Sequence, residues 1–225
     1  MSQNTENKIL TGVIWKQLLI FFFPILIGTF FQQLYNTVDA VIVGRFVGKE
    51  ALSSVGGSAG QIINLVVGFF TGLTAGGTVL ISQYYGAGQR ERLEEALHTA
   101  YAFSIVGGIL FGIAGVAATP SVLRMMNTPE ELMAQSTMYM QVYFGGLVFV
   151  FLYNMGASIL RAMGDSRRPL YFLMVSSVVN IVLDLLFIRG FSWGVAGAAF
   201  ATIIAQLISG IGSGMAIRFG GAMDG

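Results

Sequence analysis

The chain has 225 residues, of which 55% are hydrophobic and only 10% are charged, and its mean hydropathy is +0.74. Soluble domains carry about 25% charged residues, so this composition places the chain in a bilayer and excludes a soluble enzyme. A net charge of +1, no Cys and a single His also argue against a nucleic-acid-binding protein, disulfides and a metal site built from Cys or His.

Long apolar runs, separated by charged or turn residues, dominate the sequence. A membrane span needs about 20 such residues to cross roughly 30 Å of hydrocarbon. Six runs qualify, and they cover residues 13–43, 51–84, 96–118, 133–160, 170–188 and 195–217. We therefore predict an all-α integral membrane protein with six transmembrane helices over residues 13–218 and short tails at 1–12 and 219–225.

The N-terminal tail is polar, and the run that follows it is too long for a signal-peptide core and has no small-residue cleavage site. The first span is therefore expected to be retained. Six spans place eight of the 12 Lys and Arg residues on the side of the N-terminus. The positive-inside rule then predicts that both termini of a cell-membrane protein are cytoplasmic.

The connections contain residues that punctuate the spans. The segment QRERLEEAL is expected to form a short amphipathic lead-in to the third span. Pro120 and Pro129 are expected to bracket the connection after that span. Pro24 is expected to bend the first span. Small residues in the second span would let helices approach closely or bend; they include Gly56, Gly57, Gly60, Gly72, Gly76 and Gly77.

Two acidic residues lie deep within the predicted spans, Asp39 in the first and Asp184 in the fifth. An ionisable group at membrane depth costs roughly 2.5 to 3.5 kcal/mol on insertion scales, so it is a functional-site hypothesis by default. Asn180 precedes Asp184 by one helical turn and could donate to its carboxylate. The alternative is that Asp184 lies at the solvated end of its span, close to Arg189.

Other polar residues recur at helical spacing within the spans. In the first span Gln32, Tyr35 and Asn36 share a face with Asp39, a stripe that cannot favourably face lipid. Gln61 and Asn64 lie three apart in the second span, and Thr202 and Gln206 four apart in the sixth. Each pair alone is most simply explained by helix packing. Together they suggest a polar interior cavity.

Several longer motifs carry a family resemblance: FFFPILIGTFFQQLYNTVDAVIVGRFVG, QYYGAGQ, LRAMGDSRRPL, NIVLDLLF and GVAGAAFATIIAQ. In this order they resemble the N-terminal half of the multidrug and toxic compound extrusion (MATE) family. The resemblance implies one six-helix lobe of a secondary antiporter, in which two lobes flank a central cavity. It also implies that protons couple through Asp39, with Asn180, Asp184 and Thr202 in the surrounding network.

The same resemblance implies which partners the chain has. The transported compound would be a small organic cation, with Gln32, Tyr35, Asn36, Gln61, Asn64 and Gln206 as candidate cavity residues. The coupling ion would be H⁺, or Na⁺ held at Asp39, and no cofactor or catalytic residue is expected. Family members have about twelve spans, so a second six-helix lobe would come from another chain, or this sequence is truncated.

Three other functions remain open. A lipid-linked oligosaccharide flippase shares the architecture, although its substrates call for basic cavity residues and no Arg or Lys lies deep in a span here. An intramembrane aspartyl protease would use Asp39 and Asp184, but it needs a Gly-x-Gly-Asp sequence where this chain has leucine before Asp184. The third is an inactive membrane fragment.

Overall fold

The fold is a bundle of long helices, seen in a computed structural model that describes residues 13–219. The tail predicted at 1–12 lies outside the described residues, as do residues 220–225 of the tail predicted at 219–225, whose first residue, Phe219, ends α9. The helices are α2 (Ile14–Phe46), α3 (Lys49–Gly56), α4 (Ser58–Gly86), α5 (Arg90–Met125), α6 (Glu130–Gly145), α7 (Leu147–Ala162), α8 (Arg167–Asp184), a π-helical turn η1 (Leu185–Gly190) and α9 (Gly194–Phe219).

The helices are long and apolar enough for a multi-pass membrane protein, as predicted. Five segments of the described chain qualify as spans on their own, and α6 with α7 qualifies as a sixth when the bent pair is counted as one span. The bend between them is 54° and falls at Gly146. The sequence reading treated residues 133–160 as one run and did not predict this bend.

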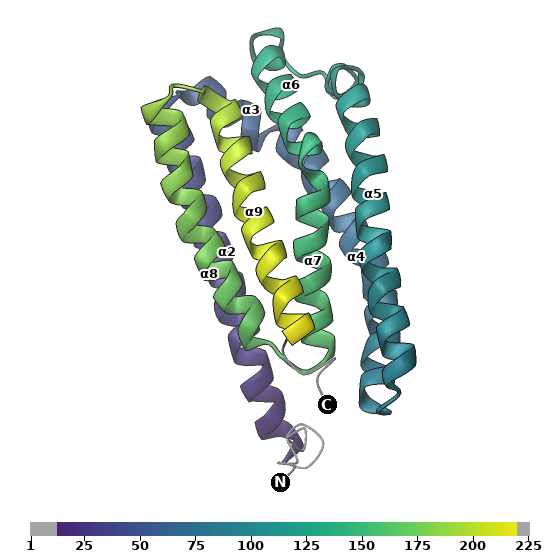
Figure 1. The fold of residues 1–225 in the computed structure, drawn as a ribbon. Coiled ribbons are helices and arrows are strands. Elements are labelled where there is room, and N and C mark those ends of the chain that lie inside the picture. The colour runs from purple at the N-terminus through teal and green to yellow at the C-terminus, as the bar shows by residue number, and fades with distance from the viewer. Residues whose placement is uncertain (1–12, 220–225) are drawn as a thin grey trace.

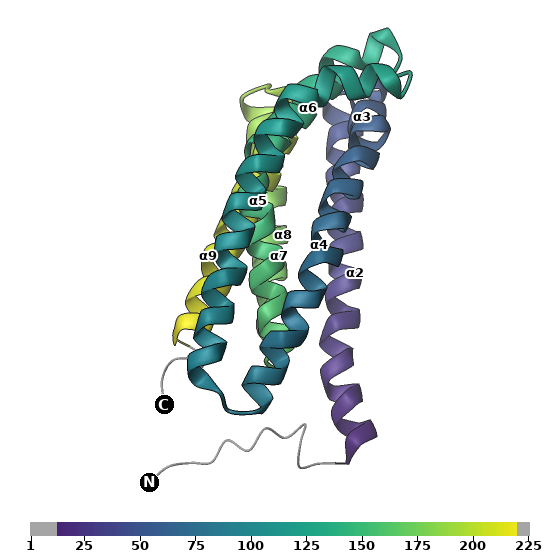
Figure 2. The same cartoon turned by 90° about the vertical axis from the view of Figure 1, so that its right-hand side faces the viewer.

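The bundle has an uneven arrangement of neighbours. In Figure 1, α8, α9, α7 and α5 stand in a row, with α2 behind α8 and α4 behind α5. Helix α2 packs mainly against α8, while α9 packs against both α8 and α7. Helix α4 packs against α5 and α7 and, within the described residues, makes no such contact with α2. Figure 2 shows α7 behind the space where α4 and α5 diverge.

The glycines that allow close packing are not those of the second span. A Cβ added at Gly108 would clash with Val148, and one added at Gly156 would clash with Ser213. These two glycines therefore let α7 approach α5 and α9 closely. At Gly76 and Gly77 an added Cβ would meet nothing within 4 Å. The prediction of close approach there was wrong, although a helix break does occur at Gly57, between α3 and α4.

Helix α5 is longer than the sequence suggested. It begins at Arg90, so the amphipathic segment forms its first turns and leads into the span as predicted, and it continues through Pro120 to Met125. Proline cannot donate to the carbonyl four residues earlier, which here is that of Val116. The side chain of Gln141 supplies the missing donor, because its Nε2 atom donates to Val116 O at 3.3 Å. This contact shows how the helix tolerates Pro120.

Candidate ion-coupling site

The seam between α2 and α8 brings the two predicted aspartates together. Asp184 ends α8 and its residue is 0% exposed, while Asp39 lies half-buried on the facing side of α2. Their carboxyl groups are within hydrogen-bonding reach of each other. Two ionised carboxylates can only accept hydrogen bonds, so this contact is satisfied when one of the two carries a proton.

No basic residue within the described chain neutralises this pair. Neither aspartate forms an ion pair with a described Lys, Arg or His, and Oδ1 of each is buried without a hydrogen-bond partner. Arg189, which was the alternative partner for Asp184, instead lies over the ring of Phe46 at 5.7 Å from its centroid. The alternative that Asp184 is solvated beside Arg189 was therefore wrong.

Asn180 joins the aspartates to α9. It is 0% exposed and lies one turn before Asp184 on α8. In one orientation of its amide, Nδ2 donates to Asp184 Oδ2 at 3.0 Å while Oδ1 accepts from the backbone N–H of Thr202 at 3.2 Å. In the other, Nδ2 donates to Thr202 Oγ1 at 3.3 Å. The first orientation satisfies both ends of the amide, as a buried amide requires.

Thr202 links α9 back to α2. Its hydroxyl donates to the carbonyl of Ala198 at 3.0 Å and lies 3.5 Å from the hydroxyl of Tyr35. Tyr35 is one helical turn before Asp39 on α2, on the stripe that the sequence predicted. Three helices thus contribute to one polar cluster, and the structure brings together all four residues predicted for coupling, with Tyr35 beside them.

The backbone changes character directly after Asp184. Residues Leu185–Gly190 form a π-helical turn, which then gives way to the loop before α9. Wider turns of this kind are frequent at functional sites in helices. The turn leaves Asp184 at the end of regular α8 while Phe187 and Ile188 remain buried against the bundle. Sequence reasoning gave no sign of it.

Two tyrosines of α6 complete the cluster and were missed from the sequence. Tyr139 and Tyr143 lie one turn apart on α6, are at most 9% exposed, and interact electrostatically with the group around Tyr35 and Asp39. Their ring centroids are 6.3 Å apart. Their four-residue spacing was visible, but a pair of tyrosines in a span is more often core or interfacial, and only the fold places them here.

The other predicted cavity residues do not join this cluster. Gln32 and Asn36 are exposed on α2, where Asn36 Nδ2 donates to Gln33 Oε1 at 3.3 Å. Gln61 and Asn64 are exposed on α4. Gln206 is half-buried on α9, one turn beyond Thr202, and its Oε1 has no hydrogen-bond partner. A substrate cavity lined by these residues stays a prediction.

The cluster has limited capacity for a metal ion. Within residues 13–219 no group of three or more His, Asp or Glu side chains is arranged to hold one. Two carboxylates, an amide oxygen and hydroxyls are nevertheless oxygen donors, which suit a hard cation. Na⁺ binding at Asp39 stays a prediction.

Comparison with known proteins identifies the family of this chain. Residues 24–186 match the family described as MatE. The chain belongs to this family. It is 33% identical over 198 residues to the probable multidrug resistance protein YoeA of Bacillus subtilis strain 168, with 86% of this chain and 42% of the relative covered. With the probable multidrug resistance protein YpnP of the same strain it shares 35% identity over 199 residues, covering 88% and 44%.

A solved structure agrees with the sequence match to the MatE family. The chain superimposes with a TM-score of 0.87 and 27% identity on a structure described as the outward-facing conformation of a multidrug resistance MATE family transporter of the MOP superfamily. All of this chain is covered, but only 49% of that one. The chain therefore has the fold of about half of a MATE transporter, and its homology is to transporters, not to intramembrane proteases.

Proposed function

We propose that this MatE chain is one lobe of a secondary antiporter that exports small organic cations in exchange for protons. The observation that carries the proposal is the carboxyl pair of Asp39 and Asp184, which lies in the bundle with no basic partner among the described residues. Ionisable residues within membrane spans are rare and typically mark ion pathways. The names of YoeA and YpnP agree with export of drugs.

The chemistry of exchange follows from competition for negative charge. With one proton bound, the pair carries a single negative charge and the protonated carboxyl donates to its ionised neighbour. When that proton leaves, the pair carries two negative charges, and this state favours a cation because burial of unpaired charge is costly. Asn180 holds Asp184 and is itself held by Thr202, and Tyr35 supplies a further hydroxyl. Proton and substrate then occupy the lobe in turn.

The driving force is large enough for useful export. One charge moving through 100 mV yields about 2.3 kcal/mol, and one pH unit adds about 1.4 kcal/mol. Exchange of one proton for one monovalent cation moves no net charge, so the pH difference alone supports about a tenfold substrate gradient when coupling is tight, and the voltage contributes when a second proton enters per cycle. The second six-helix lobe needed to close the cavity comes from another chain or from sequence that continues this one, and both termini of this lobe face the cytoplasm.

Two alternatives share the same cluster. Na⁺ held by Asp39 and neighbouring oxygens would replace the proton as coupling ion. A lipid-linked oligosaccharide flippase of the same superfamily would move a different substrate, but the described cluster is acidic and carries no Arg or Lys. The acidic cluster favours a cationic substrate over such anionic, phosphate-linked compounds.

The test is uptake of a fluorescent organic cation into everted membrane vesicles. The chain is expressed alone and with the C-terminal half of a relative, under a pH gradient and then under a Na⁺ gradient. We expect pH-driven uptake that Asp39→Asn abolishes while the amount of inserted protein is unchanged. Uptake that survives Asp39→Asn contradicts proton coupling through this residue. Uptake driven only by a Na⁺ gradient would identify Na⁺ as the coupling ion. If no combination gives uptake although the protein is inserted in the membrane, the chain is an inactive membrane fragment.

A further inference from the structure

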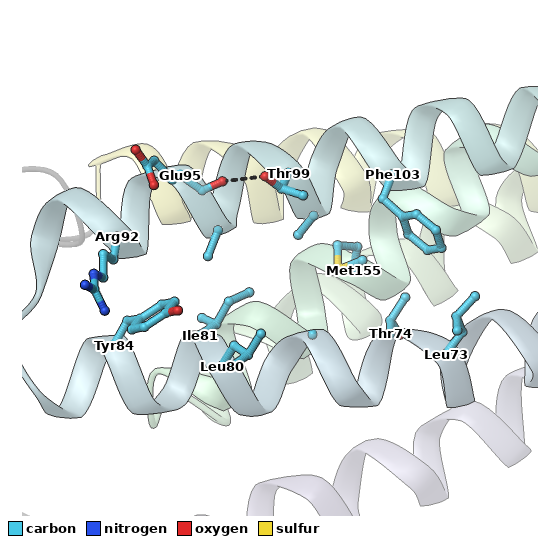
Figure 3. A pocket seen from close by; sticks show the side chains of 13 residues that line it. Leu73, Thr74, Leu80, Ile81, Tyr84, Arg92, Glu95, Thr99, Phe103 and Met155 are labelled. Carbon is cyan, nitrogen blue, oxygen red and sulfur yellow. Dashed lines mark hydrogen bonds between the residues drawn. The ribbon is translucent and has the colours of Figure 1, made fainter.

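A second feature of the lobe lies outside the aspartate cluster, in a groove between α4 and α5. Its volume is about 550 Å³, its walls are α4 and α5, and its floor reaches Met155 of α7. Figure 3 shows this groove lengthwise, with Leu73 and Phe103 at one end and Tyr84 and Arg92 at the other. The groove shares no residue with the polar cluster.

The lining is apolar over most of its length and charged at one end. Leu73, Leu80 and Phe103 form its rim and are 52%, 50% and 43% exposed, so the groove is open to its surroundings. At the end next to the α4–α5 turn, the Arg92 side chain points toward Tyr84, while the Glu95 carboxylate points away from the groove (Figure 3). Within the described chain Arg92 forms no ion pair.

The dimensions of the groove decide what fits it. With a rise of 1.5 Å per residue, the stretch of α4 from Leu73 to Tyr84 is about 16 Å long, which is half of a hydrocarbon core of roughly 30 Å. The space of about 550 Å³ extends along this stretch, and an elongated apolar space of this length suits a single unbranched acyl chain.

We propose that this groove binds one acyl chain of a glycerophospholipid from the leaflet at the α4–α5 turn, with the lipid phosphate held by Arg92 and the hydroxyl of Tyr84. The groove begins at the polar interface, where tyrosine and arginine are favoured, and ends near the bilayer midplane, as an acyl chain does. Arg92 supplies the positive charge that a phosphodiester needs. The bound chain fills the space between α4 and α5 down to α7.

Gly77 makes the groove testable. It lines the groove, and a Cβ added there would meet nothing within 4 Å, so Gly77→Leu fills the groove without forcing the backbone to move. Gly76 is the matched control, because its added Cβ also meets nothing within 4 Å but it does not line the groove. Both substitutions change helix propensity by the same amount, so they differ only in where the leucine side chain lies.

The experiment is photo-crosslinking in reconstituted vesicles. The full chain is placed in phosphatidylethanolamine vesicles that contain a small fraction of phosphatidylglycerol carrying a diazirine near the end of one acyl chain. After illumination, mass spectrometry maps the labelled peptides. We expect labelling concentrated around Leu73, Phe103 and Met155, lost for the most part in Gly77→Leu and retained in Gly76→Leu. Arg92→Gln is expected to lower it about fivefold, the contribution of one basic residue near an anionic surface.

Four outcomes would overturn the proposal. Labelling spread evenly over the outward faces of α2, α8 and the other helices would show bulk lipid only. Equal labelling of Gly77→Leu and Gly76→Leu would exclude the groove, and unchanged labelling in Arg92→Gln would exclude the phosphate contact. Labelling that disappears when a second lobe is added would assign the groove to the lobe interface. None of these readouts requires transport, so the result is independent of the proposed function.

Discussion

The lobe contains two seams between helices that differ in polarity. Between α2, α8 and α9 the helices bring together acids, an amide and hydroxyls that hydrogen-bond to one another, although Oδ1 of each aspartate has no partner. Between α4 and α5 the helices diverge and leave an apolar groove with one basic end. Interhelical polar contacts stabilise the first seam, whereas the second has to be filled by something apolar from outside. We propose that the first seam exchanges charge and that the second binds lipid.

The largest expected effect is on transport, and it compares an acidic residue in the α2–α8 seam with an exposed acidic residue on α5. Asp184→Asn should abolish coupled uptake, because an amide cannot exchange a proton with Asp39. Glu91→Gln, on the exposed first turn of α5, should leave uptake close to that of the unchanged protein. Initial rates in vesicles with matched amounts of inserted protein measure both. Equal losses in the two variants would mean that acidic charge in general, and not the seam, determines transport.

A second comparison concerns stability. Asn180→Leu removes the amide that pairs with Asp184 and Thr202, and leaving buried polar groups unpaired costs about 1–3 kcal/mol. Asn36→Leu makes the same chemical change at an exposed site on α2 and should cost much less. Unfolding of the detergent-solubilised protein in a denaturant titration gives both values. If Asn36→Leu proved as costly as Asn180→Leu, the polar seam would not be the stabilising element.

Packing offers a similar test of the closed and open parts of the bundle. Gly156→Ala places a methyl group against Ser213, and overpacking of this kind costs typically 1–3 kcal/mol. Gly76→Ala adds the same methyl group to open space and should be neutral or slightly stabilising because alanine favours the helix. Thermal unfolding midpoints distinguish them. A destabilising Gly76→Ala would indicate that α4 is more tightly packed than described.

The smallest expected effect concerns the hydrogen bond from Gln141 of α6 to the Val116 carbonyl of α5. Gln141→Leu leaves the Val116 carbonyl without its donor and should cost about 0.6 kcal/mol, the average for such contacts in membranes. Pro120→Ala restores a backbone donor to that carbonyl, so the cost of Gln141→Leu should fall in this background. A double-mutant cycle on unfolding free energy measures the coupling. Zero coupling energy would show that Gln141 does not compensate for the donor that Pro120 lacks.

Sequence patterns were reliable where they depended on a single helix. The length of each apolar run predicted the spans, since hydrocarbon thickness sets how many residues must be apolar. The spacing of Tyr35 and Asp39 on α2, and of Asn180 and Asp184 on α8, predicted which residues share a face. The motifs also indicated the family, which the match over residues 24–186 confirmed.

Other features depended on which helices meet, and no periodicity encodes that. Tyr139 and Tyr143 reach the aspartates only because α6 bends at Gly146 and packs against α9. Gln61 and Asn64 share the polarity of the α2 stripe, but α4 turns toward α5 and α7. Pro120 resembled a helix end until Gln141, from another helix, supplied its missing donor.

The sequence by itself thus determined the membrane environment, the spans and the polar face of each helix, because these follow from transfer energies and from the 3.6-residue period of one helix. The tertiary structure alone decided that Asp39 faces Asp184, that α6 adds two tyrosines, and that α4 and α5 part to form a groove. Those features arise from contacts between residues far apart in the chain, where the shape and packing of several helices act together.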